Sequence, residues 1–153
     1  MTNPDTPDAP DSHDLARFLH AQEPIYAQAV SELRSGRKQS HWMWFIFPQY
    51  AGLGLSSTSQ HYAIKSLAEA RAYLTHRVLG PRLIECAQAA VIVNAETATD
   101  LLGQPDDAKL RSCATLFAAL SPEGSVFHQL LEKYFNNHLD PATLRLLSPD
   151  ARG

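Results

Sequence analysis

The sequence has few cysteines, a shortage that argues against disulfide-stabilised and cysteine-rich metal-binding proteins. Only two of the 153 residues are cysteine, Cys86 and Cys113, and both stand among apolar neighbours in segments with helical spacing. The sequence offers no partners at the spacing that a disulfide or a zinc site requires. We therefore expect two buried, reduced thiols and a location in the cytoplasm.

Long apolar runs are absent as well. The longest run is Trp42 to Phe47, which is far short of the roughly 20 apolar residues that a bilayer-spanning helix needs. The first residues contain no basic region followed by an apolar one. We therefore expect neither export nor a membrane partner.

The chain has no excess of basic residues. Thirteen Lys and Arg against sixteen Asp and Glu give a formal net charge of −3 at pH 7. Proteins that bind duplex nucleic acid draw most of their affinity from a basic face. The balance therefore argues against duplex DNA or RNA as a partner, but it leaves room for a local cationic pocket that holds one phosphate group.

The common catalytic and metal-binding signatures are missing too. The sequence contains no HExxH, no P-loop, no GxGxxG after a strand and no GxSxG. Five of its histidines show no metal-ligand spacing: His13, His20, His76, His128 and His138. We expect no metal site and no cofactor, and the usual hydrolase and NTPase classes are disfavoured.

Helical periodicity runs through most of the remaining sequence. Apolar residues recur at a period of 3.6, and capping residues and glycines separate the periodic segments. We predict an all-α, or nearly all-α, single compact domain of about seven helices over residues 13–147. The predicted helix starts are Asp14, Pro24, Ser57 with Gln60, Ser66 with Glu69, Gly80-Pro81, Asp106, Ser125 and Asp140-Pro141, with a short turn from Thr97 to Leu102.

The two ends of the chain differ from this domain. Residues 1–12 are rich in proline and aspartate and have almost nothing to bury, so we predict a disordered N-terminal tail. Residues 148–153 are predicted to be a frayed C-terminus.

An irregular segment, Arg37 to Ser57, breaks the helical pattern after the first pair of helices. It holds both tryptophans, flanked by polar side chains and followed by two glycines whose neighbouring amides can approach a ligand closely. Its apolar part, Trp42 to Phe47, shows no period and could be a buried strand or a tight helical turn. Aromatic faces, cations and free amides together suit a flat ring joined to a sugar phosphate. The candidate ligand-binding residues are Arg37, Lys38, Ser40, His41, Trp42, Trp44, Gln49, Gly52, Gly54 and Ser57, with His61 and Arg111 from outside the segment.

A second polar cluster, Gly103 to Ser112, surrounds a predicted helix start. A structural interpretation makes Asp106 a helix cap and pairs Asp107 with Arg111 four residues later. A functional interpretation uses the helix start as an anion site, with Asp106, Asp107 and Lys109 as candidate catalytic residues.

At these residues the sequence resembles a bacterial family catalogued as domain of unknown function 1810. The motifs that carry the resemblance are GRKQSHWMWFIFPQ (Gly36 to Gln49), GLG (Gly52 to Gly54), YAIKSLAEARAYL, LGPRLIEC (Leu79 to Cys86) and GQPDDAKLRS (Gly103 to Ser112). The resemblance runs from Asp14 to about Leu147 and implies a compact, mainly helical fold without an assigned activity. The chain departs from the family pattern at Arg77, where proline is usual, and at Cys113, where serine is usual.

The order of features is also similar to the NADAR family, named for NAD and ADP-ribose, which acts on ADP-ribose-type glycosides. The similar stretches are Ser59-Gln60-His61-Tyr62, His76 to Leu83, and Gly103 to Arg111. Gln60 stands where that family has glutamate, so a carboxylate expected to matter there is missing.

Three hypotheses follow for function. The first is a binder of a nucleotide-derived ligand of the ADP-ribose type. If it also cleaves or transfers at an N-glycosidic bond, Asp106 or Asp107 would stabilise an oxocarbenium-like state and Lys109 would trap the opened sugar. The second is a protein-interaction module that uses the aromatic segment as a groove for a peptide or helix. The third places the aromatic segment in the core and the functional surface elsewhere.

Overall fold

The computed structural model describes residues 11–148 and contains ten helices over that range. They are α1 (Ala16–Gln22), α2 (Tyr26–Ser35), α3 (Met43–Ile46), α4 (Ser57–His61), α5 (Leu67–Thr75), α6 (Leu79–Ile92), α7 (Ala98–Leu102), α8 (Asp106–Ala118), α9 (Val126–Phe135) and α10 (Pro141–Leu147). The predicted all-α class is confirmed. The helix count exceeds seven because elements such as α3 and α7 have only four or five residues, too few to show a helical period.

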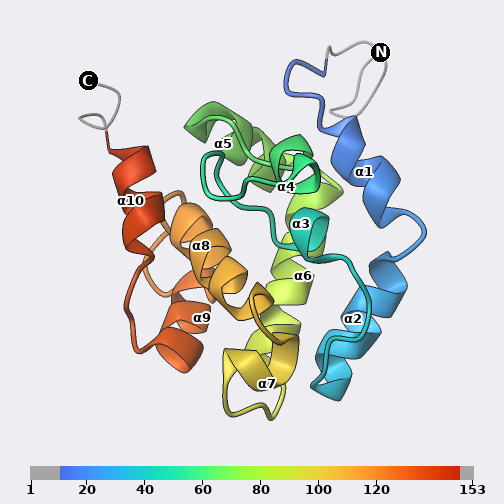
Figure 1. Ribbon diagram of the computed structural model, residues 1–153, viewed down its shortest axis with the longest axis vertical. Helices are drawn as coiled ribbons and strands as arrows, with labels where there is room; N and C mark the ends of the chain where they lie inside the picture. Colours follow the sequence, from blue (N-terminus) through green and yellow to red (C-terminus); the bar gives the residue numbers. More distant parts are fainter. Residues whose placement is uncertain (1–10, 149–153) are drawn as a thin grey trace.

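Helix α8 lies at the centre of the fold. Every residue from Ser112 to Ala118 is buried, and α8 packs against α5, α7, α9 and α10. The longest helix, α6, packs against α2, α5 and α9 and completes the core (Figure 1). No helix within residues 11–148 is long and apolar enough to cross a membrane.

The two cysteines lie in this core. Cys86 and Cys113 are buried and unpaired, as predicted. Burial raises the pKa of the Cys86 thiol to about 12 and that of the Cys113 thiol well above its ordinary value. Both side chains therefore act as small apolar core residues and not as nucleophiles.

Several predicted helix caps are confirmed, and three are wrong. Ser66, Ser125 and Asp140 each accept a hydrogen bond from a backbone N–H in the first turn of α5, α9 and α10. Asp14, Asp106 and Ser57 do not cap. Asp11 accepts from the amides of Leu15 and Ala16 in place of Asp14, Asp106 is the first residue of α8, and Ser56 caps α4 in place of Ser57.

The tails predicted for residues 1–12 and 148–153 fall mostly outside the described residues. Of these tails the structure describes Asp11, Ser12 and Ser148.

The irregular segment, Arg37 to Ser57, runs from α2 to α4 across the middle of the view in Figure 1. Its apolar part forms the single helical turn α3, which decides between the two structures that the sequence left open. Strand-like pairing among the described residues is limited to one parallel bridge between Tyr50 and Ile64. The amide of Ala51 donates to the carbonyl of Ile64, and the amide of Ile64 donates to the carbonyl of Gln49, each at 2.8 Å.

One buried carboxylate fixes the first half of this segment. Glu32 of α2 is 7% exposed and accepts five hydrogen bonds. Two come from the amides of Gln39 and Ser40, at 2.8 and 2.9 Å. Three come from side chains: the Ser40 hydroxyl at 2.6 Å, the Trp42 indole N–H at 2.9 Å and the Gln28 amide at 2.9 Å. A carboxylate with this many donors orders the backbone from residue 39 to residue 42.

The same hydrogen bonds determine the charge state of Glu32. Burial raises the pKa of this carboxyl, but the donors Ser40, Gln39, Gln28 and Trp42 outweigh burial and lower the pKa to about 2, from an ordinary 4.5. A folded-state pKa below the unfolded one stabilises the fold above pH 4.5, and this stabilisation is lost as the pH falls towards 2. A shift of this size corresponds to about 3 kcal/mol.

We expect Glu32→Gln to lower the free energy of unfolding at neutral pH by about 3 kcal/mol, because the five donors lose their ionised acceptor. The difference from the wild type should shrink as the pH falls below 4.5. Urea denaturation followed by circular dichroism across this pH range measures both effects.

The matched control is Glu23→Gln. Its carboxylate is 77% exposed and lies 3.9 Å from Arg82, so its removal should change stability by less than about 1 kcal/mol. Equal losses in the two variants at every pH would contradict the role given to Glu32.

Candidate functional site

The two polar clusters singled out in the sequence meet in space. The Lys38 ammonium lies 2.8 Å from the Asp106 carboxylate, and the Lys109 ammonium lies 3.3 Å from the same carboxylate. The Lys38 backbone amide donates to the carbonyl of Leu101 at 2.7 Å. The junction between Arg37–Ser57 and Gly103–Ser112 is therefore a compact ion-pair cluster of two cations around one carboxylate.

Each lysine of this cluster also lies over an indole ring. The Lys38 ammonium is 5.1 Å from the centre of the Trp42 ring, and the Lys109 ammonium is 4.9 Å from the centre of the Trp44 ring, both within cation–π range. The two tryptophans differ in exposure, since Trp42 is fully buried and Trp44 is partly exposed. Trp42 therefore offers no face to a ligand, whereas Trp44 does.

Trp44 lines a cavity of about 250 Å³, which we call the aromatic hollow. Its wall combines three aromatic side chains with polar ones and two glycines. It consists of Trp44, Gln49, Tyr50, Ala51, Gly52, Gly54, Ser59, Gln60, Tyr62, Ala63 and Lys65. Gly52, Gln60 and Lys65 are exposed, so solvent reaches the hollow.

Position 54 requires glycine because the backbone there lies very close to Ser59 of α4. A Cβ atom at position 54 would lie 2.5 Å from the Cβ of Ser59, which no real Cβ tolerates. Gly52 has a positive φ of 105°, a conformation that favours glycine. Gly54 thus lets the loop after α3 lie directly against α4, whereas Gly52 lies beside Leu146 of α10.

Four polar groups at the aromatic hollow are not used by the protein. The Trp44 indole N–H, the Gln49 side-chain amide and the hydroxyls of Tyr50 and Tyr62 make no hydrogen bond within residues 11–148. Because these groups are only partly buried, water satisfies them in the absence of a ligand. They can therefore exchange water for the polar edge of a ligand.

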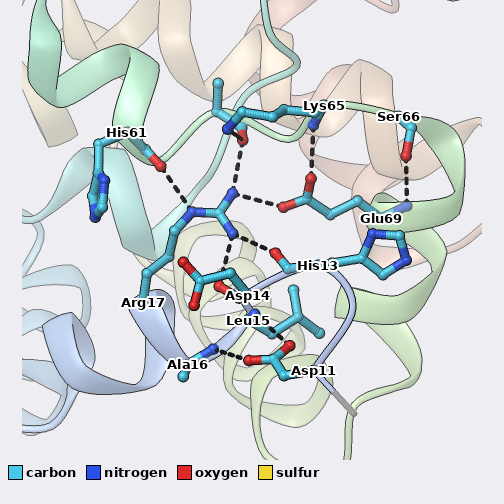
Figure 2. Close-up of polar contacts among 11 residues, drawn as sticks. Asp11, His13, Asp14, Leu15, Ala16, Arg17, His61, Lys65, Ser66 and Glu69 are labelled. Atoms are coloured by element: carbon cyan, nitrogen blue, oxygen red, sulfur yellow. Dashed lines mark hydrogen bonds and ion pairs between the residues drawn. The ribbon is translucent and has the colours of Figure 1, made fainter.

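A second cavity, of about 410 Å³, adjoins the first, and we call it the Arg17 hollow. Its lining is Ser12, His13, Asp14, Arg17, His61, Lys65, Ser66 and Glu69. Arg17 itself is occupied by the protein, as Figure 2 shows. It donates to the carbonyls of His13, Asp14, His61 and Ala63 at 2.7 to 2.8 Å and to the Glu69 carboxylate at 2.6 Å.

The candidate residues of the irregular segment divide among several places. Trp44, Gln49, Gly52 and Gly54 line the aromatic hollow. Arg37 and Lys38 line a different cavity, of about 420 Å³, together with residues 99–103. Ser40 is bonded to Glu32, while His41 and Ser57 are exposed and line none of these three cavities. His61, from outside the segment, lines the Arg17 hollow.

The candidate catalytic residues lie outside the aromatic hollow. Asp106 and Lys109 belong to the ion-pair cluster. Asp107 accepts a hydrogen bond from the Thr99 hydroxyl at 2.6 Å, and its predicted partner Arg111 instead donates to the carbonyls of His138 and Leu139, at 2.7 and 2.8 Å. Residues 11–148 contain no group of three His, Cys, Asp or Glu side chains that could hold a metal ion.

The sequence predicted only four of the eleven residues that line the aromatic hollow. Tyr50, Ser59, Gln60, Tyr62 and Lys65 were not among the candidates, although three of them belong to the stretch Ser59 to Tyr62 that is similar to the NADAR family. Clustering of tyrosine and amide side chains on both sides of the glycine pair was the signal that could have found them.

The comparisons with known proteins agree with this fold. The profile of a family described as "Protein of unknown function (DUF1810)" matches residues 12–147. The crystal structure of the conserved hypothetical protein Rv1873 from Mycobacterium tuberculosis is similar, with a TM-score of 0.87 and 48% sequence identity. The match covers 90% of this chain and 98% of that one. Among curated proteins, none matches the chain.

The two tryptophans should respond differently to solvent. In Trp44→Phe the remaining indole is the buried Trp42, so we expect a shift of the fluorescence emission to shorter wavelength and strong protection from iodide quenching. The wild type should be quenched more, because half of its indoles are accessible. Iodide titration of the two proteins measures the difference, and equal quenching would show that Trp44 does not face solvent.

Proposed function

The chain belongs to the DUF1810 family, proteins of unknown function, and we propose from its own geometry that the aromatic hollow binds a small ligand with a flat ring and a polar edge. A nucleoside is the ligand class that the wall fits best. The observation that carries this proposal is the set of unused polar groups on Trp44, Gln49, Tyr50 and Tyr62 around one cavity.

The proposal depends on a contrast between used and unused polar groups. The hydrogen bonds of Glu32, Arg17 and Arg111 order the backbone. This structural role explains the three charged side chains without a ligand. The polar groups of Trp44, Gln49, Tyr50 and Tyr62 have no such role among the described residues, whereas Ser59 and Gln60 of the same wall bond to Ser56 and Leu55. Ring faces supply contact area to a flat ligand, and a few polar groups at the edge fix its orientation.

The size of the cavity limits the ligand. Drug-sized and cofactor ligands occupy pockets of about 300–1,000 Å³, so a cavity of about 250 Å³ suits one ring and part of a sugar rather than a complete dinucleotide. We therefore propose that this cavity binds only the nucleoside part of an ADP-ribose-type ligand.

Bond cleavage is not part of the proposal. Asp106, the leading candidate for stabilising an oxocarbenium-like state, is paired with Lys38 and Lys109. Neither Asp106 nor Asp107 lines the aromatic hollow. Within the hollow the side chains are aromatic, amide, hydroxyl and ammonium groups, which suit binding.

The alternative, a groove for a partner protein, has less support. It calls for exposed apolar side chains around the aromatic segment. The large exposed apolar residues within the described part of the chain are Leu55, Ile92, Leu139 and Leu144, and only Leu55 belongs to Arg37–Ser57.

We expect calorimetric titration with a panel of nucleosides (adenosine, guanosine, cytidine and uridine) to give heat of binding for at least one of them. The fluorescence of Trp44 should change with the same dissociation constant, because this ring lines the hollow. Gln49→Ala should weaken binding about fivefold through the loss of one neutral hydrogen bond.

Gln39→Ala is the matched control, since Gln39 is exposed and lines none of the cavities described above. It should bind as the wild type does. No heat and no fluorescence change with every nucleoside up to millimolar concentration would overturn the proposed function.

A further inference from the structure

Lys65 is the one lysine of this chain without a structural task in the described residues. The other three are held in place: Lys38 and Lys109 by Asp106, and Lys133 by the carbonyls of Ala90, Val91 and Val93 at the end of α6. Within residues 11–148 no carboxylate lies within ion-pair distance of the Lys65 ammonium. It makes one long hydrogen bond, 3.3 Å to the carbonyl of Ala63, so two of its three N–H groups are free for a ligand.

Lys65 lies where two cavities meet. Lys65 belongs to the lining of both the aromatic hollow and the Arg17 hollow, so it lies on the boundary between them. The chain around it separates the two cavities, with Tyr62 and Ala63 on one side and His61 and Ser66 on the other. A ligand that extends out of the first cavity past Lys65 therefore enters the second.

The charges around the Ala63 carbonyl favour an anion at this boundary. Arg17 and Lys65 both donate to that one oxygen, at 2.8 and 3.3 Å. Glu69 balances only one of the two cations, because its carboxylate accepts from the Arg17 guanidinium and from the backbone amide of Lys65. Within the group of Arg17, Lys65 and Glu69 one positive charge is left over, and Asp14, the second carboxylate of the Arg17 hollow, forms no ion pair with either cation among the described residues.

The remaining polar groups of the Arg17 hollow are compatible with this charge. His13 and His61 supply imidazole rings that can donate to an oxyanion. The one carboxylate of this cavity besides Glu69 belongs to the exposed Asp14. Figure 2 shows it on the other side of the Arg17 guanidinium from Lys65.

We infer that the ligand carries an anionic group beyond its sugar, and that Lys65 binds this group at the boundary of the two cavities. The ligand class is a nucleoside 5′-phosphate, with the ring in the aromatic hollow and the phosphate at Lys65. This inference rests on the proposed function and adds the charged part of the ligand to it.

The experiment compares each nucleoside with its own 5′-monophosphate by calorimetry, on the wild type and on Lys65→Gln. The wild type should bind the monophosphate about tenfold more tightly than the nucleoside, as expected for hydrogen bonds between an ammonium and a phosphate. In Lys65→Gln this ratio should fall to about one, because only the monophosphate gains from the ammonium, and added salt should weaken the preference of the wild type alone.

Arg71→Gln is the control for net charge. Arg71 is exposed on α5, the helix that follows Lys65, and it lines neither cavity. This variant loses the same charge and should keep the tenfold preference.

The outcomes separate the two proposals. If nucleosides bind and their monophosphates bind no better, or if Lys65→Gln keeps the preference, the inference about Lys65 is wrong and the proposed function stands. If no nucleoside binds but inorganic phosphate and all monophosphates bind equally well, the aromatic hollow is not a ring site and the proposed function fails. Circular dichroism of Lys65→Gln confirms that a loss of preference does not come from unfolding.

Discussion

The conformation of the chain between α2 and α3 depends on one ionised carboxylate that is almost completely buried. Glu32 gathers two backbone amides, a hydroxyl, an indole N–H and a side-chain amide, all from residues 28–42. The stretch between α2 and α3 is not helical, so a multiple acceptor from the preceding helix supplies the hydrogen bonds that order it. Trp42 is thereby fixed in the core, and Trp44, two residues later, is directed to the cavity.

The polar side chains of the fold include some that order the backbone and others whose donors and acceptors remain free for a ligand. Arg17, Arg111 and Lys133 each donate to two or more backbone carbonyls and bind separate parts of the chain together. These side chains are partly buried, and their partners offset the loss of hydration. Trp44, Tyr62 and Lys65 keep free donors and also line a cavity, and this combination points to a binding surface better than residue type alone.

The sequence predicted the helices well and the site only in part. Periodicity and capping residues located nearly every helix, because both signals are local; Ser66, Ser125 and Asp140 cap as expected. The prediction that Asp106 caps α8 was wrong because a tertiary partner, Lys38, binds that carboxylate. The partners of Glu32 lie within ten residues of it, but only the fold shows that the segment after α2 turns back onto that carboxylate. The role of Arg17 could not be predicted, since its partners lie up to 52 residues away in the chain and only the fold brings them together. Tyr62 and Lys65 were missed for the same reason.

The attachment of α1 has a consequence for shortened forms of the protein. Arg17 donates hydrogen bonds to the carbonyls of His61 and Ala63, and these residues lie between the two cavities. No residue of α1 touches the aromatic hollow. A chain that began after Arg17 would therefore retain every side chain of that hollow. It would lose the hydrogen bonds that fix the backbone between the two cavities.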